Sequence, residues 1–417
     1  MSLNIDGAQF FVGIDWATEI HAVCVQDTNG RRVAAFTVEH TADGLTALMR
    51  RLVRIGDPDT MPVGIERPDG RLVDALLEAG HPVVPVKPNA IKTWRDGEVL
   101  SGAKSDAGDA EVIAEYLRLR HHRLQLATPY TPETKALRTV TRTRGDLVDM
   151  RVAATNQLCA LLDTHWPGAK AIFADVESPI ALEFLTRYPT ARHAAQLGVK
   201  RLTAFSVKHG YSGRRTGAQL LARLRAAPAG TTDETLCEAV RDAVTALVTV
   251  LTAVGAALKA LNRSVVATLG EHPDAEIFTS LPRSGQINAA QVLAEWGDCR
   301  QAYDSPDAIA ALAGVTPVTK ESGKHRAVHF RWACNKRFRV AITTFADNSR
   351  HESEWAAQVY TDACARGLDH PHAIRVLARA WIRIIWRCWN DRTPYHPDRH
   401  GNAIRLTQSR QTELVTA

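Results

Sequence analysis

The order of short apolar segments near the N-terminus constrains the fold of this chain more than any other feature. Residues 10–16, 21–26 and 32–38 read as three β-strands, and an Asn-Gly pair between the last two is a good hairpin signal. Segments with helical spacing and short apolar strands then alternate over residues 45–86. Three antiparallel strands followed by alternating helix and strand are the order of an RNase H-like domain. We therefore predict an α/β domain with a mixed sheet over residues 1–128.

Two long helical segments are predicted next, over residues 132–166 and 233–269. Apolar residues of the second segment recur every seven positions, which is typical of a helix that packs along another helix. The repeat consists of Val240, Leu247, Val254 and Leu261, with Ala243, Val250 and Ala257 as partner positions. We predict a coiled-coil linker over residues 129–274; a contact between subunits and two core helices of a middle domain are the alternatives. Residues 275–417 are predicted to form a mostly helical third domain.

Composition and charge narrow the classes of function. The chain has 51 Lys and Arg against 45 Asp and Glu, a net charge of +6, and this mild excess favours partners that carry phosphate. Its seven cysteines are scattered without a Cys-x-x-Cys pair, which fits a reducing cytoplasm and argues against a zinc ribbon. The N-terminus lacks the pattern of a secretory signal. The most apolar stretch, residues 243–258, is short for a membrane span, so we expect a cytoplasmic protein that makes no membrane contact.

Four carboxylates stand where a metal site could form. Asp15 and Glu66 each follow an apolar strand, where a carboxylate is costly unless something pairs with it. Asp106 and Asp109 share one face at the start of a helix. Hard divalent cations take oxygen ligands, and two such ions can stabilise the attacking and leaving oxygens of a phosphoryl displacement. We predict that the four side chains bind Mg²⁺ or Mn²⁺; the alternative is that the two helical aspartates only stabilise a helix N-terminus and that Asp15 is a turn residue.

The spacing of these carboxylates resembles that of the DEDD transposases, the bridge-RNA-guided insertion-sequence recombinases with a RuvC-like N-terminal domain. The C-terminal part is similar to the same family, and the match covers nearly the whole chain in the expected order. The matching segments are Leu-Pro-x-x-Gly at 281–285, Ala-Ala at 289–290, Glu-x-Gly-Asp at 295–298, Ala-Gly-Val-Thr-Pro at 313–317, Ser-Gly at 322–323 and Asn-x-x-x-Arg at 335–339.

The resemblance implies an enzyme that cuts and rejoins DNA strands. It implies a RuvC-like domain, a coiled-coil linker and a transposase domain, which assemble as a dimer or tetramer on a bridge RNA and on donor and target double-stranded DNA at the nucleoid. Asp15, Glu66, Asp106 and Asp109 would bind Mg²⁺, and Ser322 would be the nucleophile. Serine attack on a backbone phosphate would leave a covalent phosphoserine link that preserves bond energy, so the outcome would be strand exchange. A serine hydroxyl needs activation by a base or a metal; without the resemblance, Ser322 reads as a turn residue beside a glycine.

Three local departures from the family pattern affect backbone details and DNA contacts. Arg283 stands in a Pro-Arg-Ser-Gly sequence where the family usually has Pro-Gly-x-Gly, so a flexible glycine is lost. Glu66 is followed by Arg-Pro-Asp-Gly in place of a small hydroxyl residue and glycine. Cys334 occupies a position where a glycine often precedes the asparagine.

Clustered cations near the C-terminus predict a nucleic-acid interface. Residues 324–339 contain six Lys or Arg, no acid and three interleaved aromatic residues, a combination that suits phosphates and stacked bases. Arginines then recur every four residues along one helix whose other face is apolar. The predicted nucleic-acid-binding residues are Lys324, Arg326, Arg331, Lys336, Arg337, Arg339, Arg375, Arg379 and Arg383. A solvated basic face over a small aromatic core is the alternative, and a second stripe of Lys135, Arg138 and Arg142 is as consistent with ordinary solvation as with nucleic-acid contact.

Three other functions remain open at this point. A hydrolytic nuclease of the same fold, such as a Holliday-junction resolvase, would use water as the nucleophile and leave Ser322 incidental. A nucleic-acid-binding scaffold would have a degenerate metal site, although all four carboxylates are present here. A sugar-kinase-like ATPase also begins with a strand that bears an aspartate, and that family does without the phosphate-binding loop that this sequence lacks.

Overall fold

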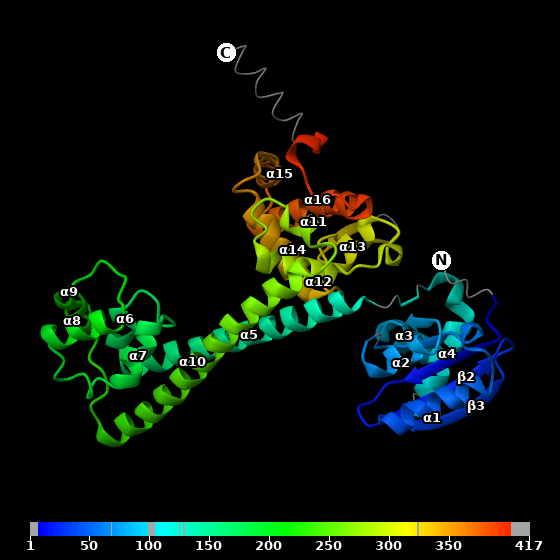
Figure 1. The fold of residues 1–417 in the computed structure, drawn as a ribbon, viewed down its shortest axis with the longest axis horizontal. Helices are drawn as coiled ribbons and strands as arrows, with labels where there is room; N and C mark the ends of the chain where they lie inside the picture. Colours follow the sequence, from blue (N-terminus) through cyan, green and yellow to red (C-terminus); the bar gives the residue numbers. More distant parts are fainter. Residues whose placement is uncertain are drawn as a thin grey trace, which may run out of the picture. The chain divides into compact units, whose positions relative to one another are not determined.

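The computed structural model describes residues 7–67, 69–98, 105–124, 126–127, 130–322 and 325–401. The chain forms two compact units (Figure 1). The first unit comprises residues 1–131 and 297–309, and the second comprises residues 132–296 and 310–417.

A mixed five-stranded sheet forms the centre of the first unit. Its order is β3-β2-β1-β4-β5, in which β1, β2 and β3 pair antiparallel and β4 and β5 join β1 in parallel. The strands are β1 (Phe10–Asp15), β2 (Ile20–Asp27), β3 (Arg32–Glu39), β4 (Val63–Ile65) and β5 (Val83–Pro85). This order is compatible with an RNase H-like fold, and the predicted α/β class with a mixed sheet is confirmed.

Helices cover the sheet of the first unit. They are α1 (Ala42–Val53), α2 (Arg71–Glu78), α3 (Pro88–Glu98) and α4 (Asp106–Arg120), with the short 3₁₀ helices η2 (Pro58–Thr60), η3 (His121–Arg123) and η4 (Arg300–Ala302). Fully buried Val12, Ile14 and Ile65 of the central strands pack with Leu48 and Leu52 of α1. Helix α4 lies on β1 and β2, with buried Ala110 and Ala114 against Ala22 and Cys24.

Two long helices, α5 (Pro132–His165) and α10 (Glu234–Gly270), run antiparallel along each other in the second unit (Figure 1). At one end of the pair the Thr134 hydroxyl lies 2.8 Å from His272 Nε2, and farther along Arg144 donates to Asn262 at 2.6 Å. Both lengths agree with the sequence prediction. In the part of the chain that the structure describes, α10 is also the one helix long and apolar enough to cross a membrane by length and composition alone.

The heptad repeat of α10 is real, but its predicted partner positions are wrong. The buried residues that repeat every seven positions are Cys237, Val244, Leu251, Leu258 and Val265. Val240 and Val254 of the predicted repeat are buried as well, whereas Val250 and Ala257 are exposed. The true partner positions therefore lie one residue beyond the predicted ones. The reason is that α10 has small apolar residues on several of its sides. The larger side chains, which fill the space against α5, decide which side is buried.

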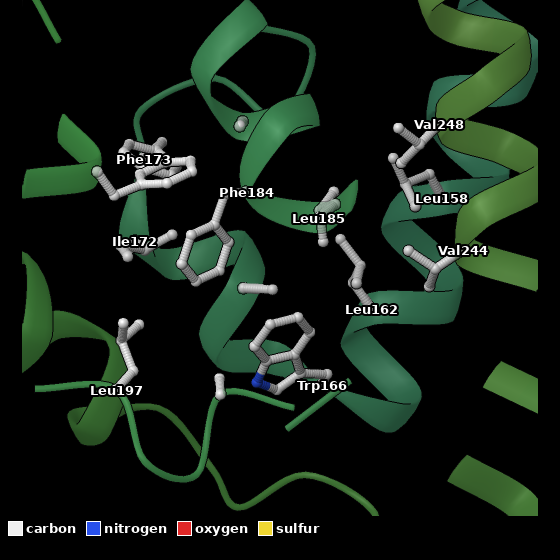
Figure 2. Packing of buried hydrophobic residues seen from close by; sticks show 14 of the residues in the cluster. Leu158, Leu162, Trp166, Ile172, Phe173, Phe184, Leu185, Leu197, Val244 and Val248 are labelled. Atoms are coloured by element: carbon white, nitrogen blue, oxygen red, sulfur yellow. The ribbon is translucent and has the colours of Figure 1, made fainter. Parts of the chain in front are cut away.

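Four short helices connect α5 to α10 and have a core of their own. They are α6 (Pro167–Ile172), α7 (Pro179–Arg187), α8 (Val199–Lys208) and α9 (Gly217–Ala226), and we call residues 167–226 the cap. Trp166 stacks on Phe184 with ring centroids 5.8 Å apart, and Phe173 meets the same ring edge-on (Figure 2). Leu158, Leu162, Val244 and Val248 of the two long helices pack against this cluster. The sequence predicted only a helical linker here, whereas the structure shows that the cap has a hydrophobic core.

The remainder of the second unit is mostly helical. Its elements are α11 (Ala275–Thr279), α12 (Gln286–Trp296), α13 (Pro306–Leu312, which begins within the first unit), the hairpin strands β6 (Val318–Ser322) and β7 (His325–His329), α14 (Lys336–Ser349), α15 (Glu354–Ala365), α16 (His370–Asp391) and η5 (Pro397–Arg399). Trp296 is fully buried between Phe278, Phe338 and Trp389. The predicted apolar face of α16 is confirmed, because Ile374, Leu377, Trp381, Ile385 and Trp389 are all buried.

Candidate active site and nucleic-acid interface

Asp15 and Glu66 leave the sheet at the same edge. Strands β1 and β4 run parallel, and Ile14 pairs with Ile65 in the register. Asp15 is the last residue of β1, and Glu66 follows the last residue of β4. Both side chains are half-buried. Because parallel neighbouring strands end at one edge, the two carboxylates emerge side by side along it.

The glycine two residues before each carboxylate lets α4 lie directly on the sheet. A Cβ atom on Gly13 would collide with the carbonyl oxygen of Ala110, and one on Gly64 would come within 2.9 Å of Ile113. Both contacts are with α4, whose first turn carries Asp106 and Asp109. The two Gly-Ile-acid sequences therefore do more than end a strand. They set the distance between the strand ends and the helix that brings the other two aspartates.

Arg95 forms an ion pair at this acidic edge. Asp109 is only 8% exposed, and Arg95 Nη1 of α3 lies 2.7 Å from its Oδ1 atom. The hydrogen bond to Asp109 raises the pKa of Arg95, and the negative charges of Asp109, Asp96 and Glu66 raise it further. The charges of two of the four predicted ligands, Asp109 and Glu66, thus act on Arg95 at once. No pattern in the sequence pointed to this arginine, because its partner lies 14 positions away on another helix.

The four predicted ligands do not form a compact group in this structure. Among the described residues, no three His, Cys, Asp or Glu side chains lie close enough together to hold a metal ion. Asp106 is exposed as the first residue of α4, where Ser105 caps the helix by accepting a hydrogen bond from Gly108 N at 3.1 Å. Arg95 pairs with Asp109, and the negative charge of Glu66 also acts on it. The site stays a prediction whose donor chemistry, all carboxylate oxygen, suits a hard divalent cation.

Ser322 is the exposed last residue of β6 and pairs with His325 across the hairpin. Beside it, Arg326 Nε lies 3.0 Å from Glu321 Oε1, an exposed ion pair that ties the two strands together. Lys324 falls outside the described residues. Ser322 belongs to the second unit, and the four carboxylates belong to the first.

A basic pocket with an aromatic ring lies behind the hairpin. Its volume is about 520 Å³, and its lining includes Arg331, Arg375, Arg379, Arg383 and Phe330. The guanidinium carbon of Arg375 lies 5.0 Å from the centre of the Phe330 ring. Burial lowers the pKa of Arg375, against the raising effect of Asp369. A pocket lined by four arginines and one aromatic ring offers the groups that phosphates and stacked bases favour.

Some of the predicted nucleic-acid-binding cations also bond within the protein. Arg331 Nε donates to Thr316 O at 3.0 Å, and Arg339 donates to Arg331 O while lying over Phe330. Arg337 forms an ion pair with Asp146 at 2.7 Å, which ties α14 to α5. Lys336 is exposed at the first position of α14. The guanidinium groups of Arg331, Arg337 and Arg339 therefore hold the local fold together.

Glu295 forms a buried polar cluster that sequence reasoning identified only as part of a family motif. It is 4% exposed, and it accepts two hydrogen bonds of 2.8 Å from Arg142 and one of 2.7 Å from Asn335 Nδ2. Burial alone would raise the pKa of Glu295, but the hydrogen bonds from Arg142 and Asn335 outweigh it, so the net pKa is lowered. Asn335 also caps α14 by accepting from Phe338 N at 3.1 Å. Arg142, for which the sequence suggested either nucleic-acid contact or ordinary solvation, is bonded to Glu295 within the protein.

Comparison with known proteins agrees with these features. Residues 12–167 match the family model of IS110-type DEDD transposases, described as a transposase, and residues 275–361 match that of the transposase IS116/IS110/IS902 family. The chain is 30% identical over 404 residues to the mini-circle putative transposase for IS117 of Streptomyces coelicolor, over 94% of this chain and 97% of that protein. It is 27% identical over 398 residues to the 44.8 kDa protein of insertion element IS116 of Streptomyces clavuligerus, over 93% of this chain and 96% of that one. A third relative, the 42 kDa protein of insertion element IS900 of Mycobacterium paratuberculosis, is 25% identical over 391 residues.

Proposed function

Because the chain belongs to the IS110 family of DEDD transposases, we propose that it exchanges DNA strands with a metal-binding carboxylate site in its first unit and a serine nucleophile in its second. The family makes it a DNA transposase, and the resemblance predicted from its motifs is confirmed. The observation that carries the proposal is the edge where β1 and β4 end beneath α4. There Asp15 and Glu66 emerge from adjacent strands and Asp109 is buried against Arg95.

Asp15, Glu66, Asp106 and Asp109 would hold Mg²⁺ or Mn²⁺ at this edge. When bound, such an ion would lower the charge that builds up on a phosphate under attack. The residues fit it in donor chemistry, since all four offer carboxylate oxygens. Asp109 would exchange its hydrogen bond with Arg95 for the ion, and Arg95 would turn away from the edge. The RuvC-like character of this domain, residues 1–128, is part of the same proposal.

Ser322 would be the nucleophile. Its oxygen would form a bond to a backbone phosphorus while the bond from that phosphorus to one deoxyribose oxygen breaks, and the freed oxygen would leave as a hydroxyl after taking up a proton. A hydroxyl from another strand would reverse the step and release the serine. The exposed position of Ser322 at the end of β6 supports this role, because a DNA backbone can reach it.

Nucleic acid would be held by the basic pocket and by the segment that includes Lys324 and Arg326. No helix-turn-helix or RNA-recognition motif stands out in the sequence, which agrees with a bridge RNA that chooses donor and target DNA. The linker, residues 129–274, would act as a coiled coil in a dimer or tetramer, and the active site would be completed between domains or subunits in the cytoplasm, at the nucleoid. Replacing Arg379 and Arg383 with Gln should weaken duplex binding and lower its salt dependence. Over a fourfold rise in salt, the affinity of the unaltered chain should fall about threefold to fourfold more than that of the variant for each lost phosphate contact.

Trapping the covalent intermediate tests the catalytic proposal. The full chain, co-expressed with the non-coding DNA that flanks its reading frame, is incubated with Mg²⁺ and a nicked duplex that carries the element's end. We expect a protein–DNA adduct that survives denaturing electrophoresis, disappears in Ser322→Ala and is absent when Mg²⁺ is replaced by a chelator. Thr319→Ala, which removes another exposed hydroxyl from β6, is the matched control and should form the adduct normally.

The same experiment distinguishes strand exchange from hydrolysis. Cleavage without an adduct, unchanged in Ser322→Ala, would overturn the serine mechanism and favour the hydrolytic Holliday-junction nuclease. An adduct that forms equally well in Asp15→Asn would overturn the carboxylate site. Sequencing of RNA that purifies with the chain tests the guide: a single structured RNA from the flanking DNA is expected, and purification of the active enzyme without any RNA would contradict it.

A further inference from the structure

The cap has a one-sided charge that the proposed catalytic site does not use. Between Glu183 and Asp233 the chain contains nine Lys or Arg and neither Asp nor Glu. All nine side chains are exposed. They are Arg187, Arg192, Lys200, Arg201, Lys208, Arg214, Arg215, Arg223 and Arg225. The chain as a whole is nearly balanced in charge, so the excess of positive charge in this segment is unusual.

The fold of the cap is held by other residues. Its core consists of buried aromatic and aliphatic side chains, among them Ile172, Phe184 and Leu197 (Figure 2). Leu202, Phe205 and Leu220 belong to the same core. Four of the cations have local partners. Arg192 pairs with Glu234 at 2.8 Å, and Arg187 lies over the Tyr188 ring. Arg201 donates to Gln196 O and Arg223 to Ala171 O. The others contribute charge to the surface.

The turn between α8 and α9 concentrates this charge. Lys208 ends α8, and Arg214 and Arg215 precede Thr216, the capping residue of α9. All three cations are exposed, and across the described parts of the chain the structure gives none of them an ion pair with an acid. The partial positive charge of the α9 N-terminus, which follows directly, adds to theirs.

Local packing presents the turn in a defined shape. The Tyr211 ring packs on Phe173 of the core, with ring centroids 5.9 Å apart. Gly213 lies so close to the Tyr211 ring that a Cβ atom would collide with it. Gly217 lies against Thr203 of α8 in the same manner, which keeps the two helices in close contact. The turn is therefore anchored on its inner side, while Lys208, Arg214 and Arg215 are left to the solvent.

We propose that the α8–α9 turn binds the phosphate backbone of double-stranded DNA, as a contact separate from the carboxylate site and Ser322. A cluster of exposed cations without acids is the surface that a polyanion favours. A duplex fits better than a single strand, because the Phe and Tyr rings of the cap pack into or against its core and none of them is fully exposed for base stacking. The contact adds affinity and no base readout, and it rests only on the chain acting on DNA.

Salt dependence measures the contact. Each phosphate neutralised by a cation contributes about 0.9 to the slope of the logarithm of the binding constant against that of salt concentration. Loss of three contacts should therefore lower the slope by roughly 3. Over a fourfold rise in salt, the affinity of the unaltered chain should therefore fall roughly 40-fold more than the affinity of the variant. A fluorescence anisotropy titration can measure a difference of this size.

The experiment uses the full chain with a chelator present, so that binding is measured without cleavage. Lys208→Gln/Arg214→Gln/Arg215→Gln is compared with the unaltered chain on a labelled duplex of arbitrary sequence, on a duplex RNA and on single-stranded DNA. Arg31→Gln/Arg50→Gln/Arg54→Gln, three exposed cations of the first unit, is the control of equal charge change. Arg214→Lys/Arg215→Lys keeps the charge and should keep the slope. Circular dichroism melting checks that the cap variants remain folded.

We expect the cap variant to lose DNA-duplex affinity and slope while the control variant changes by far less. Equal losses in the two triple variants would overturn the proposal, since the effect would then be net charge. An unchanged DNA slope with a lower RNA-duplex slope would overturn it in favour of an RNA contact. The proposed catalytic function is tested independently, because adduct formation on a saturating amount of DNA should survive in the cap variant and fail in Ser322→Ala.

Discussion

Replacing Arg142 with methionine removes the two hydrogen bonds that this arginine donates to Glu295 and keeps most of its apolar stem. Glu295 lies in α12, its other partner Asn335 caps α14, and Arg142 lies in α5, so the cluster joins three helices of the second unit. Without Arg142, a carboxylate that is 4% exposed keeps its negative charge with fewer donors. We expect the second unit to unfold more easily.

The geometry sets the size of the loss. Breaking a buried ion pair by removing one partner costs about 3–5 kcal/mol. Asn335 would still donate to Glu295 at 2.7 Å, and Arg138 Nη2 lies 3.7 Å from Oε2, close enough to compensate in part. We therefore expect the lower end of the range, about 3 kcal/mol. Glu295→Gln, which keeps the shape and removes the charge, should cost about 2 kcal/mol, the worth of hydrogen bonds to a charged group.

Urea unfolding followed by tryptophan fluorescence measures both losses, because Trp296, Trp381 and Trp389 are buried in the second unit. Arg192→Met is the matched control. Its ion pair with Glu234 has the same 2.8 Å distance, but the two side chains are 57% and 72% exposed. Removing an exposed pair should cost only about 0–1 kcal/mol. An Arg142→Met loss no larger than that of Arg192→Met would refute the reasoning, because burial would then make no difference.

The pH dependence gives a second refutation. The folded pKa of Glu295 is lowered, so its ionised form stabilises the fold at neutral pH, and this stability is lost as the pH falls through the folded pKa. The difference between the unaltered chain and Glu295→Gln should therefore shrink below the ordinary glutamate pKa. A difference that stays constant into acid would show that shape, and not charge, accounts for the loss.

Three further predictions concern the turn before α12 and the acidic edge. Arg283 has a φ of 51°, a left-handed conformation that costs about 1–2 kcal/mol outside glycine, so Arg283→Gly should raise the free energy of unfolding by up to about 1 kcal/mol, measured by urea denaturation. Gly13→Ala would force α4 off the sheet, so we expect a loss of about 1–3 kcal/mol in the same assay and loss of adduct formation. Arg95→Gln removes the cation beside Asp109, and Mn²⁺ binding measured by calorimetry should tighten; weaker binding would show that Arg95 orients Asp109 instead.

The sequence predicted elements whose signals are local. The first three strands follow from short apolar segments and a hairpin turn, and the lengths of α5 and α10 follow from uninterrupted helical spacing. Only the partner positions of the α10 repeat were predicted one residue away, because Ala257 and Val250 are as apolar as the residues that fill the seam. A local pattern shows that a face is apolar, but only the partner helix shows which side chains it covers.

Partners that are distant in sequence could not be predicted in this way. Arg142 belongs to a stripe of cations that looks the same whether it faces solvent, DNA or a buried acid. Its partner Glu295 is 153 positions away. The pairing of Arg95 with Asp109 is hidden for the same reason. The positions of Asp15 and Glu66 at strand ends could be predicted, because the strands themselves were.

Two of the buried carboxylates among the described residues, Glu295 and Asp109, differ in what holds them, and that difference separates a structural acid from a candidate ligand. Glu295 accepts hydrogen bonds from α5 and α14, so its release would require helices to move apart. Asp109 is paired with the end of one long, flexible side chain on α3. Arginine can withdraw by rotating about its own bonds, and a divalent cation then offers the carboxylate a stronger charge than the guanidinium did. Under the proposed function, the acidic edge could therefore exchange the guanidinium of Arg95 for a metal ion by a side-chain rotation, whereas the Glu295 cluster could not release its carboxylate so easily.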